Sequence, residues 1–306
     1  MARHPRLVED SVVLVEGPWT HRTVGANGIN LHVAEIGSGP LVVLLHGFPE
    51  FWWSWHHQLT ALADAGFRVV AVDLRGYGAT DKPPRGYDSM TLAADVAGLI
   101  RALGERDAAI VGHDWGAHLG WTLAAMHPRQ VRTLVAISVP HPLRWRRAVF
   151  TSYRQRRASR YIARFQLPWH PERWLVDADA ANVTRLLDRW GGPGFPDPET
   201  DRRCRDGMLI RSVPHCSLEW YRWAVRSVPR SDGRRYRVAM RAPITAPVLQ
   251  LHGALDPCVL PATARGSDRW VAGDYRWIEY DDAAHFPHEE IPDRVTADVL
   301  EWLQRS

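Results

Sequence analysis

Short, wholly apolar runs alternate along this chain with longer segments in which apolar residues recur at helical spacing. Each apolar run has the pattern of a strand buried on both faces, and the runs cover residues 40–47, 67–73, 108–113, 131–138, 246–253 and 275–280. The segments with helical spacing cover residues 52–65, 90–103, 115–127 and 292–303. Strands and helices in this order predict a doubly wound α/β fold with a mostly parallel sheet, whose binding crevice lies at the carboxyl ends of the strands.

Two stretches depart from this rhythm. Residues 21–37 alternate apolar and polar side chains around Asn27-Gly28, which predicts an antiparallel hairpin at the start of the fold. From Pro140 to Ala242 the apolar runs stop, and the chain becomes rich in Trp and Arg with helix-compatible stretches. We therefore expect a core made of residues 1–139 and 243–306, and a helical lid, residues 140–242, that is inserted between two core strands and folds over the crevice.

Composition fits a soluble globular protein with one large core, since 45% of the 306 residues are hydrophobic and 24% are charged. No run approaches the length of a membrane span, and residues 1–20 are too broken by charges for a signal peptide. We therefore expect a cytoplasmic protein. The oligomeric state stays open, with a homodimer as one candidate.

The formal net charge of +4 is carried almost entirely by arginine, because Lys82 is the only lysine. The densest run of arginines lies within residues 144–164 and could attract phosphate groups or anionic lipid. A solvated helix face, whose arginine stems cover apolar surface, accounts for the same run. Because no nucleic-acid-binding signature accompanies it, we expect neither a nucleic acid nor a membrane as partner.

The sequence gives no sign of a disulfide, a metal or a cofactor. Its cysteines are odd in number and lack CxxC spacing, which predicts reduced thiols at Cys204, Cys216 and Cys258. The histidines His113 and His118 are off one helix face, and His285 with His288 lacks further ligands nearby in the sequence. No glycine-rich stretch matches a nucleotide-binding pattern.

The stretch GHDWGA, residues 112–117, carries the candidate chemistry. Small residues flank Asp114 where a buried strand runs into a helix, and this is the G-x-nucleophile-x-G spacing of a nucleophile elbow. The helix N-terminus favours the ionised carboxylate. An ordinary aspartate helix cap is the alternative. No G-x-S-x-G occurs, which argues against a serine esterase.

Two further strand ends can complete a catalytic site. In HGFPE, residues 46–50, the turn can aim the Phe48 amide toward the elbow, where the Trp115 amide can join it as an oxyanion hole. In the chain order nucleophile, acid, histidine, Asp256 and His285 follow the last two predicted strands. A turn-forming Asp-Pro and a surface histidine are the alternatives for these two. Residues 138–150, where some triads place the acid, contain no carboxylate.

The chain resembles the epoxide hydrolases of the α/β-hydrolase superfamily over nearly its whole length. The resemblance rests on HGFPE (46–50), WWSWHHQ (52–58), DLRGYG (73–78) and GHDWGA (112–117). It implies an α/β-hydrolase fold with a helical lid, Asp114 as nucleophile, Asp256 as acid and His285 as base. It also implies two lid tyrosines that hold the epoxide oxygen.

For these tyrosines, Tyr161 stands shortly before Phe-Gln-x-Pro and Tyr221 lies in Trp-Tyr-Arg, as in the family. Either could instead be a packing residue of the lid, and Tyr153 and Tyr236 are weaker candidates. The family's usual proline-glycine segment is replaced by WHPERW, residues 169–174, which makes the local shape of the lid uncertain.

The resemblance implies an epoxide and water as substrates and a vicinal diol as product, with Phe48 and Trp115 beside the substrate. Haloalkane dehalogenases resemble the chain at HDWG, where the adjacent Trp binds halide, but they usually carry Asn where this chain has Phe48. A receptor that has kept the fold without the chemistry is a third hypothesis, since a fold alone does not establish an activity.

Overall fold

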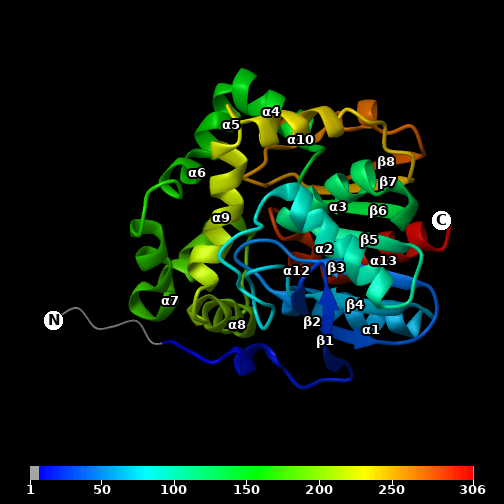
Figure 1. The fold of residues 1–306 in the computed structure, drawn as a ribbon, viewed down its shortest axis with the longest axis horizontal. Coiled ribbons are helices and arrows are strands. Elements are labelled where there is room, and N and C mark those ends of the chain that lie inside the picture. Colours follow the sequence, from blue (N-terminus) through cyan, green and yellow to red (C-terminus); the bar gives the residue numbers. More distant parts are fainter. Residues whose placement is uncertain (1–6, 306) are drawn as a thin grey trace.

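The computed structural model describes residues 7–305; residues 1–6, part of the stretch inspected for a signal peptide, and residue 306 lie outside it. One sheet of eight strands runs through these residues in the order β1-β2-β4-β3-β5-β6-β7-β8 (Figure 1). The predicted hairpin is confirmed: β1 (Thr20–Ala26) and β2 (Ile29–Ile36) pair antiparallel, and both turn residues between them have positive φ.

The six apolar runs all form strands, and these pair in parallel with one another. Every residue of β3, β5 and β7 is buried, as the absence of polar alternation predicts. The strands are β3 (Leu41–Leu45), β4 (Arg68–Val72), β5 (Ala108–His113), β6 (Val131–Ile137), β7 (Val248–Gly253) and β8 (Tyr275–Tyr280). The predicted fold class, a mostly parallel α/β sheet, is confirmed.

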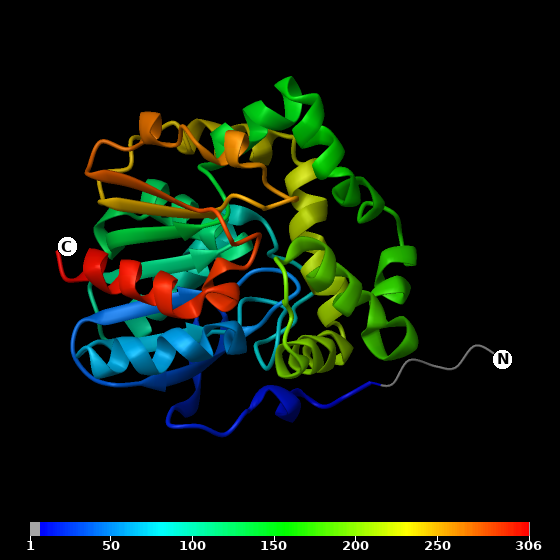
Figure 2. The same cartoon turned by 180° about the vertical axis from the view of Figure 1, so that it is seen from behind.

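Helices cover both faces of the sheet. Figure 1 shows α2 (Ser89–Ala102) and α3 (Trp115–Met126) in front of it, and Figure 2 shows α1 (His56–Asp64) and α13 (Pro292–Leu303) on the opposite face. The short elements are η1 (Asp10–Val13), η2 (Trp52–Trp55), η3 (Pro128–Gln130), α11 (Pro261–Ala264), η4 (Asp268–Trp270) and α12 (Pro287–Glu290).

Between β6 and β7 the chain forms a run of helices that gathers to one side of the sheet (Figures 1 and 2). We call residues 140–242 the helical insertion. Its helices are α4 (Pro142–Thr151), α5 (Tyr153–Ala158), α6 (Arg160–Arg164), α7 (His170–Trp190), α8 (Pro198–Leu209), α9 (Val213–Arg226) and α10 (Ser231–Ala239).

The helical insertion is attached to the rest of the fold beyond its two chain connections. The Trp220 indole N–H of α9 donates to the carbonyl of Arg75, just beyond the carboxyl end of β4. Near the start of the described chain, the Val8 amide donates to the Leu209 carbonyl at the end of α8. The three cysteines are free and buried, as expected. Within residues 7–305, none of the helices has the length and apolar character to cross a membrane.

Candidate active site

The turn between β5 and α3 holds Asp114 in a strained backbone conformation. Its φ of 49° and ψ of −114° are rarely adopted by residues other than glycine, and such strain concentrates at functional sites. The turn requires neighbours without side chains: a Cβ on Gly116 would lie 2.0 Å from the Leu45 carbonyl oxygen, and one on Gly112 would lie 2.4 Å from the Gly116 backbone. The Asp114 carboxylate makes no capping hydrogen bond to α3, so an ordinary helix cap does not describe it.

One backbone amide lies beside the Asp114 carboxylate, and a second amide without a helical partner follows it in the chain. The Phe48 amide, from the loop after β3, donates a 3.0 Å hydrogen bond to Asp114 Oδ1. Trp115 is the first residue of α3, and its amide therefore has no partner further back along the helix. Donors of this kind stabilise negative charge that develops on an oxygen.

On its other side, the Asp114 carboxylate faces a histidine that a second carboxylate orients. His285 Nε2 lies 3.6 Å from Asp114 Oδ2, and His285 Nδ1 donates a 2.8 Å hydrogen bond to Asp256 Oδ2. The other oxygen of Asp256 accepts from the amides of Cys258 and Val259, so this side chain both shapes its turn and orients the imidazole. His285 is only 2% exposed, which rules out a surface histidine. The structure thus brings Asp114, Asp256 and His285 together.

The charges of Asp114 and His285 support each other. Burial by itself would raise the pKa of Asp114, but the hydrogen bond and charge of His285 hold that pKa below its usual value. Burial by itself would lower the pKa of His285, but the charge of Asp256, with that of Asp114, holds it well above 6.5. Each group therefore favours the charged form of the other.

Two phenols from the helical insertion lie over this pair. Tyr161 of α6 and Tyr221 of α9 line a cavity of about 100 Å³ together with Asp114 and Trp115. The ring centroids of the two tyrosines are 6.0 Å apart, and the Tyr221 ring stands edge-on to that of Trp115 at 4.9 Å. Burial raises the pKa of both phenols well above 10, so each keeps a proton to donate.

The weaker tyrosine candidates lie elsewhere. Tyr153 is 69% exposed, and the Tyr236 hydroxyl is engaged with the Thr122 hydroxyl at 2.9 Å and with His118 Nε2 at 3.1 Å. Neither tyrosine is among the residues that line the cavity at Asp114. The geometry therefore favours Tyr161 and Tyr221.

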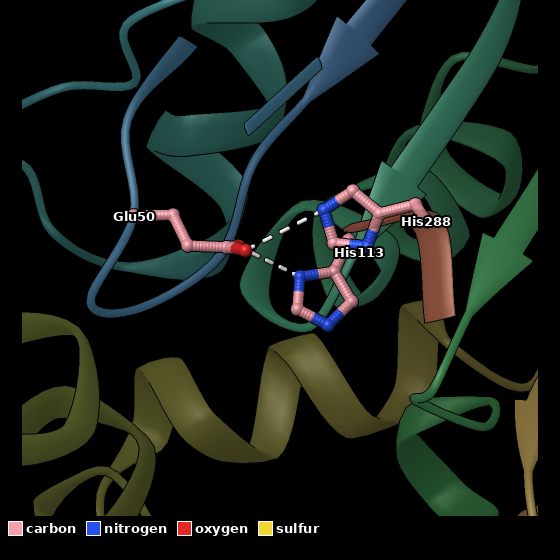
Figure 3. A group of neighbouring side chains, drawn as sticks. All are labelled: Glu50, His113 and His288. Carbon is pink, nitrogen blue, oxygen red and sulfur yellow. Dashed lines mark hydrogen bonds and ion pairs between the residues drawn. The ribbon is translucent and has the colours of Figure 1, made fainter. Parts of the chain in front are cut away.

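Next to the site lies a buried polar cluster whose residues were not predicted from the sequence to lie together. It consists of Glu50, His113 and His288, and Figure 3 shows both imidazoles turned toward the Glu50 carboxylate. Glu50 Oε2 is 2.8 Å from His113 Nδ1, and Glu50 Oε1 is 3.4 Å from His288 Nε2. The second nitrogen of His113 lies 2.7 Å from the His285 carbonyl oxygen. Through the contact between His113 and the His285 carbonyl, the cluster holds the backbone of His285 in place.

The cluster has ligand types that suit a metal ion, since its candidate ligand atoms lie within 4.8 Å of one another. Two ligands of a tetrahedral zinc ion, however, keep about 3.3 Å apart, whereas Glu50 and His113 are 2.8 Å apart. Burial would raise the pKa of Glu50, but the two histidines hold it well below 4.5, while burial lowers the pKa of His288 to about 4. A hydrogen-bonded network around one buried carboxylate accounts for this geometry.

Comparison with known proteins places this arrangement in a family. Residues 40–292 match the family described as the alpha/beta hydrolase fold. The AB hydrolase superfamily protein YfhM of Bacillus subtilis is 36% identical, over 92% of this chain and 96% of its own length. Epoxide hydrolase A of Mycobacterium tuberculosis is 32% identical, over 94% of this chain and 98% of its own length.

Comparison with solved structures also finds epoxide hydrolases. An epoxide hydrolase from Bacillus megaterium in complex with an inhibitor has a TM-score of 0.82 and 28% identity, and the match covers 92% of this chain and 100% of that one. An epoxide hydrolase from Vigna radiata has a TM-score of 0.81 and 28% identity, with 94% and 98% of the two chains covered.

Proposed function

Because this chain belongs to the epoxide hydrolases of the α/β-hydrolase superfamily, we propose that it converts an epoxide into a vicinal diol through an ester on Asp114. The observation that supports this most strongly is one small cavity that holds an ionised carboxylate and two protonated phenols. In this proposal the helical insertion is a lid domain, and residues 1–139 and 243–306 form the catalytic core.

Ring opening uses the carboxylate and the phenols. An epoxide presents a tetrahedral carbon that must be attacked from behind, and Asp114 can do this because it is already ionised. Tyr161 and Tyr221 donate hydrogen bonds to the departing oxygen, and one of them transfers its proton to the far more basic alkoxide. Acid assistance of this kind is commonly about 10²- to 10⁴-fold in rate.

Ester formation then prepares the second step. It removes the negative charge of Asp114, which is one of the interactions that keep His285 protonated, so the pKa of His285 falls. The proton that His285 loses restores the phenol. Neutral His285, held by Asp256, takes a proton from the water that attacks the ester carbonyl, and the Phe48 and Trp115 amides hold the oxyanion. Collapse of this intermediate breaks the bond between the Asp114 carbonyl carbon and the substrate oxygen, and the proton of the added hydroxyl passes to that oxygen, which releases the diol and restores the carboxylate.

Haloalkane dehalogenation is the second candidate, because the Trp115 indole at the cavity is the group that would bind a departing halide. Two phenols whose pKa values stay well above 10 favour an oxygen leaving group, since each can give it a hydrogen bond and a proton. Measurement of halide release from a haloalkane beside diol release from an epoxide separates the two.

The decisive experiment is a single turnover in ¹⁸O-water with enzyme in excess over a simple aryl epoxide. Because the diol takes its new oxygen from Asp114, we expect the first diol to be unlabelled and the label to enter the Asp114 carboxylate. Replacement His285→Gln should preserve ring opening and stop hydrolysis, so the intact mass of this variant should rise by one substrate. Label in the first diol, or an Asp114→Asn variant that still forms the adduct, would overturn the proposal.

A further inference from the structure

A second and larger cavity opens on the other side of Tyr161. It measures about 650 Å³ and lies among α5, α6 and α7, the helices that run along the edge of the molecule away from the sheet (Figure 1). Aromatic rings form part of its lining, among them Tyr161, Phe165 and Trp190. The other conspicuous group is a set of arginines, which we call the arginine mouth: Arg157, Arg160, Arg164, Arg185 and Arg189.

The aromatic part of this cavity adjoins the candidate active site. Tyr161 lines both the large cavity and the one that holds Asp114. The Trp190 ring lies 4.9 Å from the ring of Tyr161 and 6.1 Å from that of His285, and the Trp190 carbonyl accepts a hydrogen bond from the His285 amide. Tyr161 is the residue that the two linings share, so a substrate that occupies both cavities must pass its side chain.

The charges of the arginine mouth are not balanced by acids. Within residues 7–305, none of its five guanidinium groups lies within 4.0 Å of a carboxylate, and no acidic residue lines the cavity. The arginines of α8 behave differently, because Arg202, Arg203 and Arg205 each pair with an acid one helical turn away. Arginine stays charged at any physiological pH, so the mouth is a lasting site of positive potential.

The opposite side of the Asp114 cavity presents mostly apolar side chains, with Arg146, Arg156, Arg160 and Arg237 also in the lining. A cavity of about 500 Å³ shares Trp145, Ile162 and Val225 with it and continues between α4, α9 and α10. Its wall includes Phe150, whose side chain is 59% exposed. The Asp114 cavity thus adjoins the arginine mouth on one side and, on the other, a cavity whose wall combines apolar side chains with arginines.

We propose that the substrate of this reaction is an amphipathic epoxide, with a carboxylate or phosphate group held in the arginine mouth and an apolar arm in the cavity beside Phe150. This inference rests on the proposed function. Guanidinium groups match the planar oxygens of carboxylates and phosphates, and their potential also draws an anion toward the mouth. Binding of the charged group orients the epoxide between Asp114 and Tyr161.

The test compares three epoxides of equal length whose chain ends in a carboxylate, a phosphate monoester or a neutral amide. We expect a higher kcat/KM for an anionic epoxide than for the amide, and the carboxylate and phosphate arms identify which anion the mouth prefers. The preference should shrink as potassium chloride is raised, because salt screens exposed charges.

The double variant Arg164→Gln/Arg189→Gln should lower kcat/KM for the preferred anion about tenfold, mainly through KM, and change that of the amide less than about twofold. The matched control is Arg106→Gln/Arg129→Gln, which removes the same net charge at exposed positions that precede β5 and β6. Equal kcat/KM for all three epoxides, or equal losses in both double variants, would overturn the inference. Formation of a diol in the same assays would still support the proposed function. Absence of diol from every epoxide would overturn both.

Discussion

His285 lies between two carboxylates, and the protonation of its ring depends on both. In the proposed reaction Asp256 keeps its hydrogen bond to His285 Nδ1, whereas the Asp114 carboxylate becomes a neutral ester. The pKa of His285 is well above 6.5 when both are charged, and it falls when Asp114 is esterified. A single residue therefore serves as a cation that supports the nucleophile and then as a base.

This change of state predicts different pH dependences for the two chemical steps. Ring opening needs ionised Asp114, whose pKa lies below 3.8, and protonated phenols, whose pKa values lie well above 10, so its rate should stay level as the pH falls to about 5. Hydrolysis needs neutral His285, so its rate should fall as the pH drops through the pKa of His285 in the ester. Quenched-flow mass spectrometry should find more ester at about pH 5 than at about pH 7.5. Equal amounts of ester at both values would contradict this assignment.

The phenols give a second prediction at single positions. Because Tyr161 and Tyr221 share the departing oxygen, each replacement by Phe should slow ring opening, and the double variant should lose about 10²- to 10⁴-fold. We would measure the rate at which the covalent adduct forms in variants that also carry His285→Gln, because that replacement stops hydrolysis and leaves only ring opening. Tyr153→Phe is the matched control, because that phenol is 69% exposed and outside the cavity at Asp114. A double variant with an unchanged rate would exclude the phenols as acids.

Some residues of the site could be predicted from the sequence, and others could not. Asp114, Asp256 and His285 follow predicted strands, and the carboxyl ends of parallel strands meet at one edge of a sheet. The contact between Glu50 and His288 joins residues 238 positions apart in sequence with no periodic pattern, so only the folded chain brings them together. Glu50 nevertheless belongs to HGFPE, and an acidic residue directly after a buried strand could have marked it as a candidate site residue.

Among the elements, the strand β5, the turn at Asp114 and the helix α3 act as one unit. The φ of 49° at Asp114 persists because β3 packs directly against the start of α3, with no room for a side chain on Gly116. The sequence indicated this unit through its spacing of small residues. It could not give the dihedral angles, which depend on the neighbouring strand.

Replacement Gly116→Ala tests this packing. The new Cβ would lie 2.0 Å from the Leu45 carbonyl oxygen, which is rigid backbone, so α3 must move away from β3. We expect the free energy of unfolding to fall by about 1–3 kcal/mol or more in urea titrations, and activity to fall further. Gly25→Ala in β1 is the control, because a Cβ there meets nothing within 4 Å. Equal stability of the two variants would contradict the packing argument.

The long elements of the core were predicted individually, whereas short helices and the separate helices of the helical insertion were not. The apolar runs and helical periods gave every strand of the parallel sheet and the helix at residues 292–303. Helices such as α11 and α12 span four residues, which is too short for a period to be recognised. Within the helical insertion, the separation of α4 from α5 depends on the Ser152 side chain, which accepts from the Gln155 amide.

In the molecule as a whole, the three cysteines are buried free thiols, and one of them, Cys258, lies beside Asp256 and His285. Burial raises the pKa of Cys204, Cys216 and Cys258, which keeps them as thiols. We expect a thiol-reactive dye to label none of them quickly in the native protein and all three after unfolding in urea. The melting temperature should be the same with and without reductant. Rapid labelling of the native protein would contradict the burial of these side chains.

The helical insertion is attached to the rest of the fold at its two chain connections, to β6 and to β7, and by hydrogen bonds that include Val8 to Leu209 and Trp220 to Arg75. A segment attached at several separate places does not rotate as one rigid body about a single hinge. We therefore expect epoxide and diol to travel past individual side chains at the openings beside Tyr161, with the scaffold of helices staying in place. Turnover limited by such local side-chain rearrangements would respond to the size of the residues that border those openings more than to solvent viscosity.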